Sequence, residues 1–191
     1  MNLRDKKVII FDMDGTLIDS VPDIAVAVNR VLETLGYPTY SEATMRNWVG
    51  NGATVLVKRA LLGNTDETLP LETSLHEEAM QLFFRFYAAQ TVEKTRLYPG
   101  VTETLHRVYS EGYILALVTN KPYRFVPPLL KGLELDILFS YVLGGDSLAE
   151  KKPSPLPLLT VCEHFDIEPK EAVMVGDSHN DILAANAAGM E

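Results

Sequence analysis

Four short apolar runs along the chain predict β-strands that are buried on both faces. They are Val8–Phe11, Tyr113–Val118, Tyr141–Leu143 and Ala172–Val175. These runs do not alternate with polar side chains, which is typical of strands covered on both sides rather than on one. Each run stops at polar, loop-forming residues, so each predicted strand ends in a loop.

Helical patterns separate these runs: Val101–Tyr109, Pro127–Leu133, Pro155–Phe165 and Asp181–Ala188. Strands that alternate with helices predict an α/β fold with a parallel sheet and right-handed crossovers. In such sheets ligands bind at the carboxyl ends of the strands. The polar residues after the four strands are therefore expected to converge on one crevice.

One long interval, residues 20–95, has no strand-like run and breaks the alternation. Its helical patterns are Asp23–Leu35, Ser41–Trp48, Ala53–Leu62 and Leu75–Gln90. Glycine, proline and polar residues punctuate them. We therefore expect two parts, a core made of residues 1–19 and 96–191 and an all-helical, lid-like cap made of residues 20–95.

Composition and charge narrow the function. The 191 residues are 47% hydrophobic and 23% charged, as in ordinary globular proteins, and carry a net charge of −9. This charge disfavours nucleic acid and acidic membranes as partners but allows a small anionic substrate if a metal neutralises an acidic cleft. The single cysteine, Cys162, and the shortness of the apolar run near the N-terminus predict a cytoplasmic protein without disulfides or signal peptide.

Two carboxylates follow the first strand directly, Asp12 and Asp14. One carboxylate of such a pair can attack phosphorus or bind a metal, while the other moves a proton to and from the reacting oxygens. Gly15 allows a tight turn near a phosphate, and Thr16 can hold a carboxylate by a hydrogen bond. The alternative is an ordinary acidic turn, because Asp and Gly are common loop residues.

Two further acids follow the last strand. Asp177 suits a metal ligand, and Asp181 suits either an outer partner of the ligands or a charge at a helix start. Carboxylates from two neighbouring strands repel one another unless a hard cation neutralises them. Mg²⁺, which prefers oxygen ligands, is the expected cofactor.

Donors and a cation follow the remaining strands. Lys152 precedes a proline-led helix, and Thr119 with Asn120 can offer a hydroxyl and a backbone N–H to phosphoryl oxygens. The alternatives are a solvated loop lysine and a polar loop. Counter-charge is needed because a carboxylate that approaches a phosphate dianion meets about 4 kcal/mol of repulsion per charge pair at ~4 Å and a dielectric near 20.

In this order the motifs resemble those of the haloacid dehalogenase superfamily: Asp12-Met13-Asp14-Gly15-Thr16, Thr119-Asn120, Lys152-Pro153, and Gly176-Asp177 with Asp181. The resemblance implies a Rossmann-like core with an inserted helical cap. It implies Asp12 as nucleophile, Asp14 as general acid and base, and Thr119, Asn120 and Lys152 as phosphate-binding residues. It also implies Mg²⁺ bound by Asp12, Asp177 and the backbone carbonyl of Asp14, with Asp181 and Thr16 supporting these ligands.

Several segments, such as Thr119-Asn120-Lys121-Pro122, resemble the phosphoglycolate phosphatase family within this superfamily. The resemblance implies 2-phosphoglycolate as substrate and a cap loop, Gly50-Asn51-Gly52, near it; an inter-helix turn is the plain alternative for that loop. Hexose-phosphate or nucleotide phosphatases, a phosphomutase and a phosphate-binding pseudo-phosphatase stay open. Members usually continue past Gly189 with another strand and a loop, so this sequence leaves the edge of the sheet open.

Overall fold

The protein divides into two compact units in this computed structural model, which describes residues 3, 5–66 and 68–190. One unit combines Met1–Asp19 with Leu97–Glu191, and the other is Ser20–Arg96. All four predicted strands fall in the first unit, and Glu191 lies outside the described residues. The assignment of these units to a catalytic core and a cap stays a prediction.

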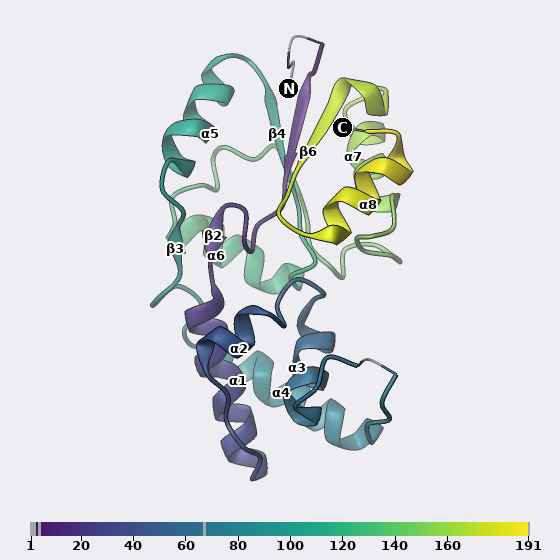
Figure 1. Ribbon diagram of the computed structural model, residues 1–191. Helices are drawn as coiled ribbons and strands as arrows, with labels where there is room; N and C mark the ends of the chain where they lie inside the picture. The colour runs from purple at the N-terminus through teal and green to yellow at the C-terminus, as the bar shows by residue number, and fades with distance from the viewer. Residues whose placement is uncertain (1–2, 4, 67, 191) are drawn as a thin grey trace. The chain divides into compact units, whose positions relative to one another are not determined.

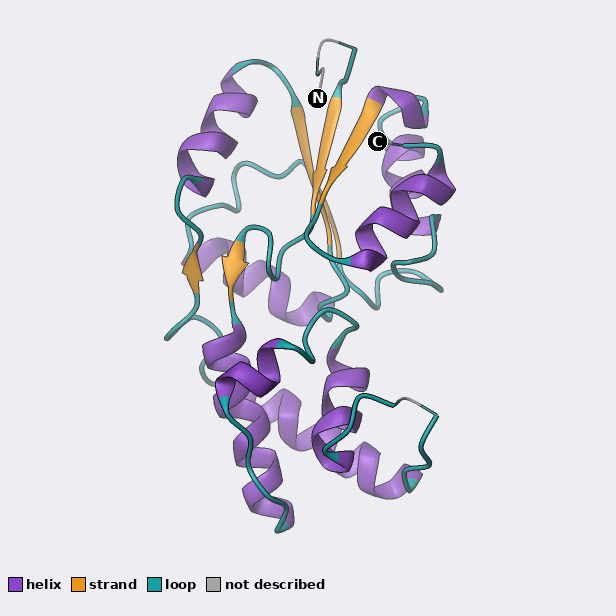
Figure 2. Ribbon diagram, viewed as in Figure 1, coloured by secondary structure: helices purple, strands orange, loops and turns teal. Residues whose placement is uncertain are grey.

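A four-stranded parallel sheet forms the centre of the first unit (Figure 2). Its strands are β1 (Val8–Phe11), β4 (Ile114–Val118), β5 (Tyr141–Leu143) and β6 (Ala172–Val175), in the order β5-β4-β1-β6. Val8 pairs with both Ile114 and Ala172, so β1 lies between β4 and β6. The four predicted strands are confirmed, with β4 beginning one residue later than expected.

Two very short strands were not predicted from the sequence. Strands β2 (Ile18–Asp19) and β3 (Arg96–Leu97) form a second, two-stranded sheet. A strand of two residues is too short to show a hydrophobic period, so the sequence carries no pattern that could reveal it.

Helices cover both faces of the four-stranded sheet (Figure 1). They are α5 (Val101–Ser110), α6 (Val126–Gly132), α7 (Leu156–His164) and α8 (His179–Ala188), with 3₁₀ turns η1 (Tyr123–Phe125) and η2 (Pro169–Glu171). Alternate strand residues, such as Val8 and Ile10, pack in one apolar cluster with Leu158 of α7 and Ala184 of α8. Because both faces are buried, the strands could be predicted as unbroken apolar runs.

The second unit contains helices α1 (Val21–Leu35), α2 (Glu42–Arg46), α3 (Ala53–Leu62) and α4 (Thr73–Ala88). The left-handed conformation of Gly36, with φ 76°, ends α1. Helix α4 packs against α1 and α3, and its Phe83 and Tyr87 rings stack with centroids 5.4 Å apart. None of the helices in the described part of the chain has the length and apolar character that a membrane crossing requires.

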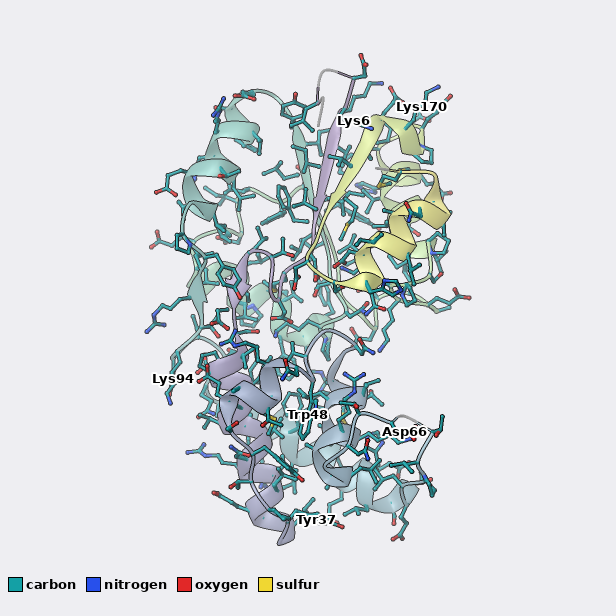
Figure 3. The ribbon with its side chains drawn as sticks, viewed as in Figure 1. Lys6, Tyr37, Trp48, Asp66, Lys94 and Lys170 are labelled. Carbon is teal, nitrogen blue, oxygen red and sulfur yellow. The ribbon has the colours of Figure 1, made fainter. Side chains whose placement is uncertain are left out.

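A buried carboxylate ties the two ends of this helical unit together. Asp23, in the first turn of α1, is 1% exposed. It accepts hydrogen bonds from the backbone N–H of Lys94 (3.0 Å), which Figure 3 labels, and from the N–H and hydroxyl of Thr95 (2.8 and 2.7 Å). These donors compensate the cost of burying the charge, so Asp23 fixes where the chain leaves the last helix relative to where it enters the first.

Candidate active site

The carboxyl ends of β4, β1 and β6 bring three predicted site segments together. The backbone N–H of Asp12 donates to Val175 at 2.9 Å, and that of Thr119 donates to Leu143 at 3.0 Å, so the parallel ladder continues one residue beyond each strand. Asp177 follows β6, the neighbour of β1. The expected convergence of polar strand ends at one edge is confirmed.

The opposite end of the sheet carries different chemistry. Lys6 and Lys170 lie there (Figure 3), and the Lys6 ammonium donates to the Lys170 carbonyl at 2.9 Å. That contact is exposed and links the start of β1 to η2. The acids that the sequence analysis singled out all follow the carboxyl ends of the strands.

Three of those acids form a compact cluster. Each of Asp12, Asp177 and Asp181 offers a carboxylate oxygen, and these oxygens lie within 4.8 Å of one another. Asp12 and Asp181 are buried, whereas Asp177 is exposed. An arrangement of hard oxygen ligands that is half buried and half open to solvent suits Mg²⁺, which keeps some of its water on binding proteins.

Glycines let the backbone approach two of the carboxylates closely. Gly15 has φ 89°, and a Cβ placed there would collide with the carboxylate of Asp177. A Cβ on Gly176 would collide in the same way with the carboxylate of Asp181. The Thr16 hydroxyl donates to Asp177 Oδ1 at 2.9 Å, so Thr16 holds this carboxylate as expected.

Lys152 is the buried cation of the cluster. Its side chain is 2% exposed, and its ammonium donates to Asp181 Oδ1 and to the Val118 carbonyl, both at 2.6 Å. It also lies 3.0 Å from Asp12 Oδ1. The Asn120 side-chain amide donates to the Lys152 carbonyl at 3.0 Å and so helps to fix the lysine backbone. The alternative of a solvated loop lysine is therefore wrong.

Asp12 lies in an unfavourable environment for a carboxylate. Burial raises the pKa of Asp12 to about 6; the neighbouring Asp181 and Asp14 add to this effect, and Lys152 opposes it. Oδ1 of Asp12 accepts no hydrogen bond from the described residues, because the nearby Lys152 ammonium is outside hydrogen-bonding geometry. A buried carboxylate oxygen without such a partner is costly, and functional sites are where this cost is commonly found.

Asp181 combines the two roles that the sequence left open. Its Oδ2 accepts from the backbone N–H (2.9 Å) and the hydroxyl (2.6 Å) of Ser178, at the start of α8. Its Oδ1 accepts from Lys152. Asp181 thus braces a helix start and holds the lysine, in addition to lying near the other acids.

One charged residue of the site was missed by sequence reasoning. The Lys121 ammonium lies 3.0 and 3.1 Å from the two carboxylate oxygens of Asp14, and its side chain is only 4% exposed. The backbone N–H of Lys121 donates to the Thr119 hydroxyl at 3.2 Å. The sequence feature that could have identified Lys121 was its place in the segment that resembles phosphoglycolate phosphatases. A lysine after a strand does not, however, reveal where its side chain points.

The charges of this edge leave a defined deficit. Asp12, Asp14, Asp177 and Asp181 carry four negative charges when ionised, and Lys121 and Lys152 carry two positive ones. One divalent cation would cancel the two negative charges that remain. Together with the buried Asp12 oxygen that lacks a hydrogen bond, this balance shows that the residues fit a bound Mg²⁺ ion.

The predicted cap loop belongs to the other unit. Gly50, Asn51 and Gly52 connect α2 to α3, with φ values of 122° at Gly50 and 89° at Gly52. Arg59 donates to the Trp48 carbonyl at 2.8 Å and so anchors the start of this turn. The turn is thus an inter-helix connection, and its proximity to a substrate stays a prediction.

Comparisons with known proteins agree with this geometry. Residues 9–191 match the family model described as haloacid dehalogenase-like hydrolase. A phosphoglycolate phosphatase of Psychrobacter arcticus is 53% identical over 98% of this chain and 82% of its own length, and one of Colwellia psychrerythraea is 44% identical over 100% and 84%. The crystal structure of a predicted phosphoglycolate phosphatase from Haemophilus somnus superimposes with a TM-score of 0.92 at 42% identity, over 99% of this chain and 84% of that one. With its acids at the carboxyl ends of neighbouring parallel strands and a family match over almost all its length, this chain belongs to the haloacid dehalogenase-like hydrolases.

Proposed function

We propose that the protein is a Mg²⁺-dependent phosphatase that hydrolyses 2-phosphoglycolate to glycolate and phosphate through an aspartyl-phosphate on Asp12. The observation that carries the proposal is the buried Asp12 carboxylate, which lies in one cluster with Asp177 and 3.0 Å from the ammonium of Lys152. The names of the relatives at 44–53% identity support the choice of substrate. The proposal places the reaction in the cytoplasm.

In the first half-reaction, Asp12 attacks phosphorus and the ester bond between phosphorus and the substrate oxygen breaks. Asp14 enters this half-reaction protonated, gives its proton to the departing alkoxide and is left ionised. In the second half-reaction, a water molecule attacks the phosphoryl group, Asp14 takes a proton from that water, and the bond between Asp12 and phosphorus breaks. Both carboxylates return to their starting state, and phosphate leaves.

Counter-charge allows one anion to attack another. Asp12, Asp177 and the backbone carbonyl of Asp14 would hold Mg²⁺, which supplies positive charge where the attacking carboxylate and the phosphoryl group meet. Lys152 supplies a second positive charge beside Asp12. Each unit charge at ~4 Å offsets about 4 kcal/mol of repulsion at a dielectric near 20. Thr119 and Asn120, next to this lysine, are proposed to bind phosphoryl oxygens.

The test is the release of inorganic phosphate by the purified protein from a panel of phosphate monoesters, with and without Mg²⁺. We expect release that needs Mg²⁺ and a kcat/KM for 2-phosphoglycolate above those for hexose phosphates and nucleotides. A preference for one of the other esters would overturn the substrate but keep the phosphatase. Transfer of phosphate between sugars with little release would instead identify a phosphomutase, and phosphate binding without any turnover a pseudo-phosphatase.

A further inference from the structure

We propose that Lys121 is a positioning residue that holds Asp14 in the orientation needed for both proton transfers. The proposal rests on the proposed function, in which Asp14 protonates the leaving alkoxide and later takes a proton from water. Its basis is the contact of one buried ammonium with both oxygens of that carboxylate, at 3.0 and 3.1 Å.

The backbone of Lys121 is fixed from two sides. Its N–H donates to the Thr119 hydroxyl at 3.2 Å, and its carbonyl accepts from the N–H of Gly145 at 2.8 Å. Gly145 itself packs so tightly that a Cβ there would collide with the carbonyl of Asn120. The next residue is proline, whose ring restricts its own backbone and the conformation of the residue before it. The lysine side chain therefore starts from a well-defined point on the loop after β4.

Lys121 contacts Asp14 as other side chains contact the neighbouring acids. Asp14 follows β1 in a loop, and Gly15, the next residue, has φ 89°. Asp177 is held by Thr16, and Asp181 is held by Ser178 and Lys152. A carboxylate side chain that contacts an ammonium through both oxygens has lost most of its freedom to rotate. Lys121 thus gives Asp14 a fixed direction, as these other contacts do for Asp177 and Asp181.

The two lysines form ion pairs with different acids. Lys152 pairs with Asp12 and Asp181, whereas Lys121 pairs with Asp14. Both lysines are almost completely buried, and buried lysines are rare unless they are paired. Removal of Lys121 should therefore impair the steps in which Asp14 moves a proton and spare the attack of Asp12. Misplacement of a reacting group by about 1 Å can cost about a hundredfold in rate.

The experiment compares Lys121→Met with Lys131→Met, which removes the same charge from the exposed surface of α6. The substrates are p-nitrophenyl phosphate, whose leaving group needs no proton, and the best alkyl phosphate of the panel above. With the aryl ester, Lys121→Met should keep a burst of p-nitrophenol at the wild-type rate, while the steady-state rate falls by ten- to a hundredfold. With the alkyl ester the first turnover should slow by a similar factor. Lys131→Met should match the wild type throughout.

A double-mutant cycle with Asp14→Asn completes the test. If Lys121 acts only through Asp14, Lys121→Met should add little to the loss already caused by Asp14→Asn. A further large loss in the double variant would show that Lys121 acts on the substrate itself and would overturn the proposal. A smaller burst amplitude that matches a loss of folded protein, as measured by thermal melting, would also overturn the proposal. If Lys121→Met does not fold, Lys121→Gln, which keeps a hydrogen-bond donor, takes its place.

Failure of this inference differs from failure of the proposed function. A wild-type protein without Mg²⁺-dependent phosphatase activity would refute the function. An active wild type whose Lys121→Met variant has unchanged kinetics with both esters would leave the function intact and refute the role of Lys121.

Discussion

Buried aspartates occur in both units of the molecule, and their surroundings differ. Asp23 in the helical unit accepts hydrogen bonds from two backbone N–H groups and one hydroxyl. Asp12 in the α/β unit has other carboxylates as neighbours, and its Oδ1 accepts no hydrogen bond from the described residues. Both are almost completely buried, so burial alone does not distinguish a structural acid from a reactive one.

The difference lies in how well each charge is compensated. Neutral donors aimed at Asp23 compensate its desolvation without the help of any ligand. Asp12 has one ammonium, that of Lys152, at 3.0 Å, and this does not outweigh its burial and the neighbouring acids, so its pKa stays raised. The proposed function adds the missing positive charge as a metal ion. A buried acid that the fold leaves poorly compensated is the one to suspect of chemistry. Substitution of Asp12 should therefore reduce activity and spare stability, whereas substitution of Asp23 should reduce stability and largely spare activity.

Asp12→Asn should have the largest effect, on activity. In the proposed mechanism Asp12 is the nucleophile, and a variant without it forms no aspartyl-phosphate, so kcat for Mg²⁺-dependent phosphate release should fall by at least about 10⁴-fold. In EDTA the variant should melt no lower than the wild type, because the substitution removes a buried charge from among like charges. Wild-type activity in a pure Asp12→Asn preparation would eliminate Asp12 as nucleophile.

Asp23→Ala should have the next largest effect, on stability. The substitution leaves three donors of Lys94 and Thr95 without their acceptor, which should lower the free energy of unfolding by about 4 kcal/mol. Activity per folded molecule should change far less than after Asp12→Asn. Urea unfolding measures the free energy of unfolding. The phosphate-release assay, normalised to the amount of folded protein, measures the activity per folded molecule.

Asp66→Ala is the matched control for Asp23→Ala. Asp66 lies in the same unit (Figure 3) and also accepts from a threonine N–H and hydroxyl, those of Thr68 at 3.0 and 2.6 Å, but it is exposed. Water can replace it, so this variant should lose much less stability than Asp23→Ala. Equal losses at the two positions would mean that burial is not what makes Asp23 important.

The sequence predicted the sheet well because its physical signal is local. Buried parallel strands such as Val8–Phe11 are unbroken apolar runs, and polar residues mark where they end. Parallel order then forces those ends to one edge, which is why Asp12, Asp177 and Lys152 could be expected close together. Helix ends were less certain: α1 begins at Val21 rather than Asp23, with a proline in its first turn.

The remainder depends on directions that sequence does not encode. Lys121 and Lys152 are both lysines in loops. Lys152 could be expected at the site from its Lys152-Pro153 motif, whereas Lys121 was not predicted, and the sequence showed the direction of neither side chain. Their burial results from the packing of the loops after β4 and before α7 around the acids. Asp23 was predicted as the first residue of a helix, and the acceptor role that it plays toward Lys94 and Thr95, some seventy residues further along, is visible only in the fold.

The pH dependence of stability gives a smaller expected effect than Asp23→Ala and the sharpest view of the difference between the two aspartates. The folded-state pKa of Asp12, about 6, lies above its ordinary value of 3.8, so between these values the folded protein binds more protons than the unfolded chain. The contribution of Asp12 to stability is therefore complete below about pH 4, is lost as the pH rises to about 6, and amounts to at most about 3 kcal/mol. In EDTA, the stability of Asp12→Asn relative to the wild type should thus increase across this window and stay level above it, as urea unfolding at a series of pH values would measure.

Saturating Mg²⁺ at pH 7 should diminish or reverse that advantage, because the ionised Asp12 carboxylate then has its cation. A difference between the two proteins that did not vary with pH would mean that Asp12 is as well compensated in the empty site as Asp23 is in the helical unit.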